Sequence, residues 1–233
     1  MEDTTLDDLQ YNNLHLRQNR KGYRSSEDSL LLLYTLSKKL GCNFSGNAFE
    51  FGTGSGIISI LLAAKIPEIT ITAIEIQDSL FNLAKENVMH SGMDKKIILI
   101  RMDGREVQNE IKKETFHCAY SNPPFFQKGY GKISPNQEKQ YAKHEELCTM
   151  NDVLMVFSHI LKKGGRGFII YPTHRLSECV EKIDNIPNLF LHEINFFYNL
   201  KKQTGSWKAS QNERNYKTLE KESKLFVAEM RKK

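Results

Sequence analysis

The chain has few of the residues that build metal sites or disulfide frameworks. Its four cysteines, Cys42, Cys118, Cys148 and Cys179, are scattered without the close pairing of zinc sites, so we expect no metal. We expect a reducing, cytoplasmic setting as well. No apolar run approaches the length of a membrane span, and the acidic, polar start lacks the pattern of a secretory signal. These absences predict no membrane partner.

Two common phosphate-binding motifs are also missing. The segment Phe49–Gly56 (FEFGTGSG) joins a predicted strand to a predicted helix, and its glycines are spaced Gly-x-Gly-x-Gly. A dinucleotide fingerprint needs its third glycine where this chain has Ile57, and no Gly-Lys-Ser/Thr follows as in a P-loop. Glu50 would repel a pyrophosphate. The loop therefore favours a ligand with a positively charged amino group and a ribose.

Positive charge is concentrated in two places. The net charge is +5, but residues 199–233 hold ten Lys/Arg and four Asp/Glu, so the rest of the chain is close to neutral. A second basic cluster consists of Arg17, Arg20, Lys21 and Arg24. Such asymmetry predicts a polyanionic partner, with a solvated lysine-rich surface as the alternative.

Strand-like and helix-like segments alternate from about residue 47, which is typical of a wound parallel α/β sheet. The predicted strands are 48–51, 69–74, 96–101, 116–120, 167–171 and 225–230. The predicted helices are 29–40, 57–65, 78–90, 107–112 and one capped by Thr149 or Asn151 that runs to Ile160. A turn is expected at 162–165. A long polar loop at 127–146 has the character of a functional loop.

Polar residues follow four predicted strands in succession: the glycine loop, then Glu75, then Asp103-Gly104, then Asn122. In an open α/β sheet, ligands bind at the carboxyl ends of the strands. Glu75 can accept hydrogen bonds from a ribose diol, and Asp103 can accept one from an adenine amino group. One such acid alone can be an ordinary exposed residue, but the ordered series predicts a nucleoside site.

The tetrapeptide Asn122-Pro123-Pro124-Phe125 is the most informative motif. Neither proline has an N–H to donate, so the strand must stop and leave the asparagine at its end. The Asn122 side-chain carbonyl and the Pro123 backbone carbonyl could accept both N–H groups of a planar amine, and Phe125 could stack on its base. The base would have to leave its stack to reach such a pocket. Proline pairs also end strands for purely structural reasons.

With these residues in place, the chain resembles class I S-adenosylmethionine-dependent methyltransferases, and more closely the bacterial adenine-N6 methyltransferases that modify valine tRNA beside the anticodon. Three stretches carry the resemblance: residues 18–32 (QNRKGYRSSEDSLLL), the loop 51–56, and 122–125 with the loop behind it. It implies a Rossmann-like seven-stranded sheet with helices on both faces, S-adenosylmethionine as cofactor, and tRNA as the partner. The sequence does not define the oligomeric state, for which a monomer is favoured. The resemblance weakens after about residue 190.

The motifs and the resemblance together assign three sets of site residues. The catalytic set is Asn122, Pro123 and Phe125. The cofactor set is Glu50, Gly52, Gly54, Gly56, Glu75, Asp103, Gly104 and Asn122. The substrate set is Arg20, Lys21, Arg24, Asp28, Pro124, Phe126, His144, Lys201, Lys202 and Trp207. Asp28 could instead cap a helix, His144 could be an exposed loop residue, and Trp207 could pack the domain.

We expect residues 1–40 to form an N-terminal extension that covers the substrate or cofactor. Residues 41–233 would form the methyltransferase domain, with 196–222 a basic aromatic insertion before the last strand. Protein-glutamine amide methylation and adenine methylation in rRNA or DNA remain alternative activities. A scaffold that binds the cofactor without turnover is the alternative from a different class.

Overall fold

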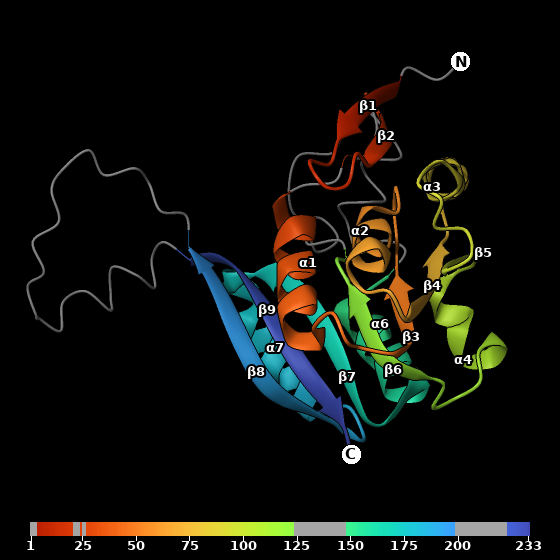
Figure 1. Ribbon diagram of the computed structural model, residues 1–233. Helices are drawn as coiled ribbons and strands as arrows, with labels where there is room; N and C mark the ends of the chain where they lie inside the picture. The colour runs from red at the N-terminus through yellow and green to blue at the C-terminus, as the bar shows by residue number, and fades with distance from the viewer. Residues whose placement is uncertain (1–3, 21–23, 25–26, 124–147, 199–222) are drawn as a thin grey trace, which may run out of the picture.

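A seven-stranded sheet forms the centre of the computed structural model, which describes residues 4–20, 24, 27–123, 148–198 and 223–233 (Figure 1). The strand order is β5-β4-β3-β6-β7-β9-β8. Neighbours from β5 to β7 are parallel, whereas β9 is antiparallel to both β7 and β8. The strands are β3 (Gly46–Phe51), β4 (Ile69–Glu75), β5 (Ile97–Arg101), β6 (Phe116–Ser121), β7 (Leu161–Pro172), β8 (Leu189–Tyr198) and β9 (Ser223–Lys232).

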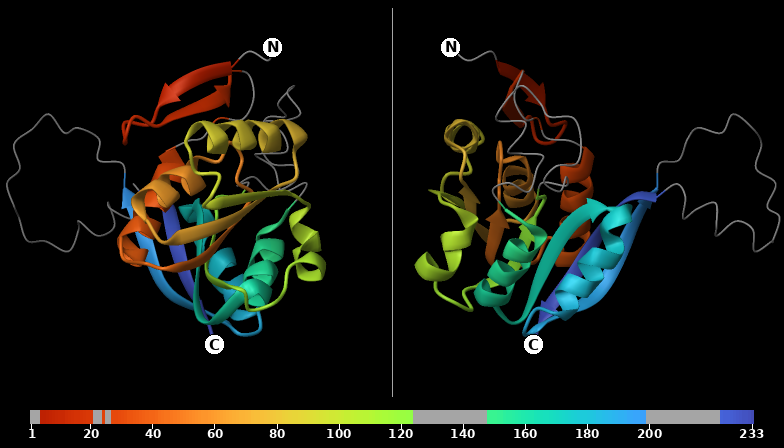
Figure 2. Two further views of the ribbon diagram at one scale, coloured as in Figure 1. Left: turned by 45° about the vertical axis from the view of Figure 1, so that its right-hand side comes forward. Right: turned by 180° about the vertical axis from the view of Figure 1, so that it is seen from behind.

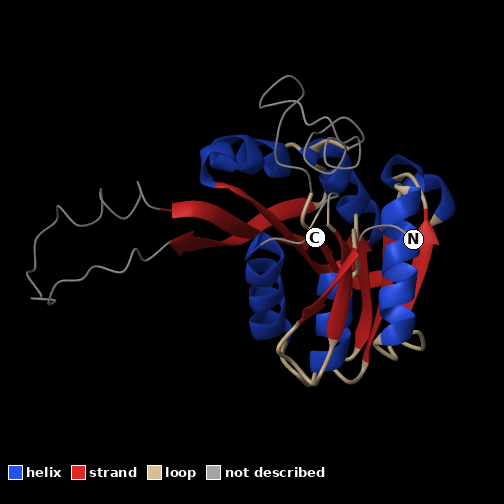
Figure 3. Ribbon diagram, turned by 90° about the horizontal axis from the view of Figure 1, so that it is seen from above, coloured by secondary structure: helices blue, strands red, loops and turns tan. Residues whose placement is uncertain are grey.

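Helices cover both faces of this sheet, as Figure 3 shows from above. They are α1 (Glu27–Leu40), α2 (Ile57–Lys65), α3 (Asp78–His90), α4 (Val107–Glu110), α6 (Met150–Ile160) and α7 (Leu176–Asp184), with 3-10 turns η1 (Gly104–Glu106) and η2 (Thr173–Arg175). None of the described helices is long and apolar enough to cross a membrane. The predicted α/β sheet with helices on both faces is confirmed.

Two hydrophobic clusters lie on opposite faces of the sheet, because successive strand residues point to opposite sides. In β3, Ala48 packs with buried residues of α1 and α2, and Phe49 packs with those of α6 and α7. In β6, Tyr120 belongs to the first cluster and Ala119 to the second. The central strands are thus buried on both faces, as parallel strands require.

A small hairpin precedes α1 and was not predicted from the sequence. Strands β1 (Thr4–Asp8) and β2 (His15–Asn19) pair antiparallel as a separate sheet. The intervening turn uses left-handed backbone at Asn12 and Asn13, with φ of 48° and 55°. The hairpin lies at the end of the molecule where β3, β4 and β6 finish (Figures 1 and 2). Leu16 of β2 is fully buried in the first cluster, so the hairpin packs onto the domain.

Several local features of the structure differ from the expectations or refine them. Strand β8 and helix α7 were not predicted, and β8 includes residues 196–198, with which the predicted insertion begins. The turn expected at 162–165 lies inside β7, where those residues bulge out between the pairings of Leu161 and Arg166. Thr149, rather than Asn151, caps α6, in a capping box with Asp152. The predicted loop at 127–146 lies outside the described residues, as do residues 199–222 of the insertion.

Candidate active site

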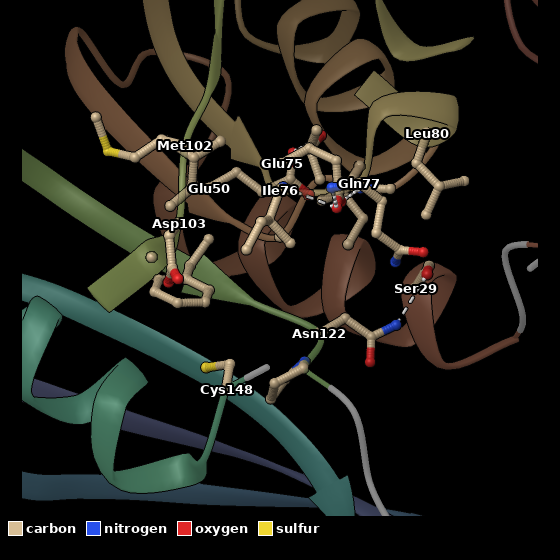
Figure 4. Close-up of a pocket in the computed structure, with 18 of the residues that line it drawn as sticks. Ser29, Glu50, Glu75, Ile76, Gln77, Leu80, Met102, Asp103, Asn122 and Cys148 are labelled. Carbon is tan, nitrogen blue, oxygen red and sulfur yellow. Dashed lines mark hydrogen bonds between the residues drawn. The ribbon is translucent and has the colours of Figure 1, made fainter. Parts of the chain in front are cut away.

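The main pocket opens at the carboxyl ends of β3, β4, β5 and β6, which are neighbours in the sheet (Figure 4). It encloses about 830 Å³, a volume that includes space open to solvent. The described lining residues are Ser29, Glu50, Phe51, Gly52, Thr53, Gly54, Ile57, Ile58, Ile74, Glu75, Ile76, Gln77, Leu80, Met102, Asp103, Gly104, Asn122, Pro123 and Cys148.

The glycine loop after β3 forms one wall of the pocket. Gly52, Gly54 and Gly56 all have left-handed backbone, with φ of 73°, 59° and 88°. A side chain at any of them would be strained, which explains the glycine at every second position. Gly52 and Gly54 line the pocket, and Gly56 is the N-cap of α2. The loop thus brings its backbone to the ligand and then starts the helix.

Glu50 is a buried carboxyl group at the end of β3, with 1% of its surface exposed. Its Oε2 accepts a hydrogen bond from Thr53 Oγ1 at 2.6 Å and another from Ser59 Oγ. Desolvation by burial raises the pKa of Glu50 from 4.5 to about 7, against the opposing effect of these hydroxyl groups. A cation in the pocket would favour the charged form of Glu50.

Glu75, at the end of β4, holds the adjoining loops in place. Its Oε2 accepts from the Gly54 backbone N–H at 2.9 Å, and its Oε1 accepts from the N–H groups of Ile76 and Gln77 at 3.0 and 2.9 Å. Each carboxylate oxygen has two lone pairs. The residue therefore joins the end of its own strand to the glycine loop and lines the pocket, where the sequence placed it.

Asp103 follows β5 and is held by Arg105, which the sequence did not single out. The Asp103 Oδ1 accepts from the Arg105 backbone N–H at 2.9 Å, which caps η1. The Arg105 guanidinium also donates to both carboxylate oxygens. These hydrogen bonds lower the pKa of Asp103 from its ordinary value. Asp103 is thus kept ionised at the pocket edge.

Gly104 permits a close approach between η1 and β3. A Cβ placed on Gly104 would lie 1.9 Å from Cζ of Phe51, far inside van der Waals contact. The Phe51 ring, 6% exposed, can occupy this position in the pocket wall only because residue 104 has no side chain.

Asn122 and Pro123 complete the pocket at the end of β6. Ser121 Oγ donates to the Phe51 carbonyl at 2.8 Å, which ties the ends of β6 and β3 together. Asn122 Nδ2 donates to Ser29 Oγ of α1 at 3.0 Å. Ser29 is a pocket residue that the sequence reasoning missed, although it adjoins Asp28 in the stretch that resembles the family.

The predicted substrate residues lie largely apart from this pocket or outside the described part of the chain. Arg24 donates to Asp7 Oδ2 at 2.5 Å, and Arg20 Nε donates to the Thr4 carbonyl at 3.5 Å, both beside the hairpin. Asp28 lies in the first turn of α1, which begins at Glu27, so it is not the N-cap. The residues outside the described part are Lys21, Pro124, Phe125, Phe126, His144, Lys201, Lys202 and Trp207.

The charged side chains in the described lining of the pocket are all acidic. Its described lining includes the carboxyl groups of Glu50, Glu75 and Asp103 but no lysine, arginine or histidine. The field of such a lining favours a cationic ligand over a phosphate. Across the described ranges, no three His, Cys, Asp or Glu side chains are arranged to hold a metal ion.

This fold is that of the class I methyltransferases. The structure of the TYW2 protein of M. jannaschii in complex with AdoMet covers all of this chain and 88% of its own, with a TM-score of 0.60 at 13% identity. A precorrin-6y C5,15-methyltransferase from Geobacter metallireducens has a TM-score of 0.60 at 14% identity, over 97% of this chain and 96% of its own. Residues 26–138 also match the model of the methyltransferase small domain family.

The relatives found by sequence similarity carry a more specific name than the methyltransferase small domain family. A tRNA1(Val) (adenine(37)-N6)-methyltransferase of Bacteroides thetaiotaomicron is 32% identical over 125 residues, which is 53% of this chain and 51% of the relative. A protein of the same name from Porphyromonas gingivalis is 26% identical over 66% of this chain and 61% of its own. The matches thus span between half and two thirds of these relatives. The resemblance stated from the motifs is confirmed.

Proposed function

We propose that the chain is an S-adenosylmethionine-dependent methyltransferase that acts on the exocyclic amino group of an adenine in RNA. The observation that carries the proposal is that Asn122 and three carboxyl groups, on four neighbouring strand ends, line one pocket. The names of the sequence relatives support tRNA, at the adenosine beside the anticodon, as the substrate. We further propose a monomer that works in the cytoplasm.

The pocket suits this cofactor in charge and in the chemistry of its acceptors. Glu50, Glu75 and Asp103 line the pocket. Glu50 would pair with the ammonium group, Glu75 would accept from a ribose diol, and Asp103 would accept from an adenine amine. When bound, S-adenosylmethionine supplies a methyl group on a sulfonium sulfur, which keeps the electron pair of the broken C–S bond as the N–C bond forms. No lysine, arginine or histidine of the described lining competes with such a cation for the carboxyl groups.

The protein's own part is to hold and activate the amine. An adenine amino nitrogen is a poor nucleophile, because its lone pair is delocalised into the ring. Two acceptors, the Asn122 Oδ1 and the Pro123 carbonyl, would draw both N–H groups out of the plane and free the lone pair. Holding the nitrogen in line with the methyl carbon would supply much of the rate enhancement. The surplus proton passes to water after transfer.

The remaining predicted residues would bind the RNA. Phe125 would stack on the flipped base, flanked by Pro124, Phe126 and His144. Arg20 and Arg24, which hydrogen-bond to residues of β1, would contact phosphates together with Lys21. Lys201, Lys202 and Trp207 would form a further RNA-binding surface, and Asp28 would line the edge of the cofactor or substrate. The N-terminal extension, whose Ser29 lines the pocket, would cover the bound ligands.

The test is transfer of labelled methyl groups from S-adenosylmethionine to tRNA, rRNA, DNA and a protein extract, each supplied separately. We expect label in tRNA that digests to N6-methyladenosine. Asn122→Ala should lower the rate at least 100-fold while the cofactor Kd changes less than threefold. Asn109→Ala, at an exposed position of α4, is the matched control and should be unaffected.

Other outcomes would redirect the proposal. Label in protein alone would move the function to side-chain amide methylation, and label in rRNA or DNA alone would keep the chemistry but change the substrate. Cofactor binding without label in any substrate would favour a non-catalytic scaffold. Full activity in Asn122→Ala would refute the proposed amine activation.

A further inference from the structure

An asparagine that activates an amine must present the correct end of its amide. Oδ1 accepts hydrogen bonds, whereas Nδ2 can only donate them. An amide turned by 180° would direct its N–H groups at the N–H groups of the substrate. Catalysis by Asn122 therefore requires a partner that engages Nδ2 and leaves Oδ1 facing the substrate.

Ser29 meets this requirement. Its Oγ lies 3.0 Å from Asn122 Nδ2, a normal hydrogen-bond length, and the residue is 4% exposed. Figure 4 shows the Nδ2 of Asn122 turned toward Ser29, with Oδ1 on the far side of the amide from that contact. The two residues are 93 positions apart in the sequence and come from α1 and the end of β6.

The helix that holds Ser29 is firmly packed. Leu32 and Leu36, one and two turns further along α1, are fully buried in the first hydrophobic cluster. The position of Oγ is therefore set by the core rather than by a surface loop. A partly buried hydrogen bond to a fixed partner restricts rotation of the Asn122 side chain about χ2, which is otherwise broad.

We infer that Ser29 is a positioning residue that orients the Asn122 amide for amine activation. The inference rests on the proposed function. A serine hydroxyl can accept a hydrogen bond, and Ser29 Oγ accepts from Asn122 Nδ2. Once an amine occupies the pocket, only Oδ1 can accept from it, and Ser29 then accepts from Nδ2 at the other end. Ser29 thus acts on the transfer step rather than on cofactor affinity.

The test compares three variants in single-turnover methyl transfer. Ser29→Ala should lower the transfer rate about five- to tenfold, the effect of one lost hydrogen bond, with the cofactor Kd unchanged within twofold. Ser29→Thr keeps the hydroxyl and should recover at least half of the wild-type rate. Ser37→Ala is the matched control on the same helix, because Ser37 Oγ has no hydrogen-bond partner among the described residues.

A second readout follows the amide directly. In ¹⁵N-labelled protein, the Asn122 Nδ2 resonances should move in Ser29→Ala and stay in place in Ser37→Ala. Unchanged transfer in Ser29→Ala, or a fall in rate matched by an equal loss of cofactor affinity, would overturn the inference. If Asn122→Ala loses activity while Ser29→Ala does not, only this inference fails. If Asn122→Ala keeps full activity, the proposed mechanism fails with it.

Discussion

Asn87 of α3 donates a hydrogen bond from its side-chain amide to the backbone carbonyl of Ser55, in the glycine loop, at 2.9 Å. The same amide pairs with a residue of the hairpin: Nδ2 donates to the Arg17 carbonyl at 2.9 Å, and Oδ1 accepts from the Arg17 N–H at 2.8 Å. Asn87 is 2% exposed. One side chain therefore connects the loop, the helix and the N-terminal hairpin.

Replacing Asn87 should weaken the packing of the hairpin and the glycine loop against α3. Asn87→Ala would leave the Ser55 carbonyl and both backbone groups of Arg17 without these partners, and we expect unfolding to become easier by about 2–3 kcal/mol. Urea denaturation measures the stability, and hydrogen exchange at the Arg17 amide reports the hairpin. Asn82→Ala, at an exposed position of the same helix, should change little. Unaltered exchange at Arg17 would contradict the prediction.

Glu50 should make stability depend on pH. Its pKa is about 7 in the folded protein and 4.5 when exposed, so the folded state favours the protonated form. The stability from this protonation is present below about pH 4.5 and is lost as the pH rises through 7. Glu50→Gln keeps an acceptor without the charge. Between pH 5.5 and pH 8, the unfolding free energy of wild type should therefore fall by about 2 kcal/mol relative to that of Glu50→Gln, because one pKa unit corresponds to about 1.4 kcal/mol.

The same variant should bind the cofactor more weakly than wild type at pH 8, because the carboxylate that balances its ammonium group is gone. Calorimetric titration at both pH values measures this effect, and denaturation at both values measures stability. A pH-independent stability difference would show that Glu50 is charged in the folded protein throughout this range. Equal cofactor affinity at pH 8 would show that the ammonium lies elsewhere.

Gly104→Ala should disturb the pocket through Phe51. The new Cβ would meet the ring at 1.9 Å, so the ring must move into the space that it lines. We expect the cofactor Kd to rise about tenfold, and overpacking to lower stability by about 1–3 kcal/mol. Adding Phe51→Leu should restore much of the affinity.

Calorimetric titration of each variant measures the affinity. Gly92→Ala is the control for general destabilisation, because Gly92 has left-handed backbone but open space around it. That variant should lose stability and keep the cofactor affinity of wild type. No rescue by Phe51→Leu would argue against a steric cause.

The parallel core could be predicted from the sequence because its local signals agree with its packing. Helices α2 and α3 begin and end where the sequence placed them, with Gly56 before the first and Ser91-Gly92 after the second. Four consecutive strand ends could be assigned to one site, because parallel strands that neighbour each other finish at one edge. Glu50, Glu75, Asp103 and Asn122 do line one pocket.

Strand β8 and the hairpin strands, which the sequence did not predict, lack a regular pattern of apolar residues. In β8 a bulge between Leu191 and Glu193 interrupts the alternation that would identify a strand. The hairpin strands are five residues each and carry few apolar side chains. The contacts of Ser29 with Asn122 and of Gly104 with Phe51 join segments distant in the chain. Sequence spacing cannot predict them before the packing is known.

The strand order determines which strands can pair while the chain is being synthesised. Strand β9 follows β8 in the chain but lies between β7 and β8 in the sheet. During translation, β8 leaves the ribosome before the strand that joins it to the rest of the protein. Until β9 arrives, both β7 and β8 present unpaired edges, which are the sites where nascent chains associate wrongly. All the strands and glycines that line the pocket precede β8 in the chain. The ligand site can therefore form before β9 pairs with β7 and β8.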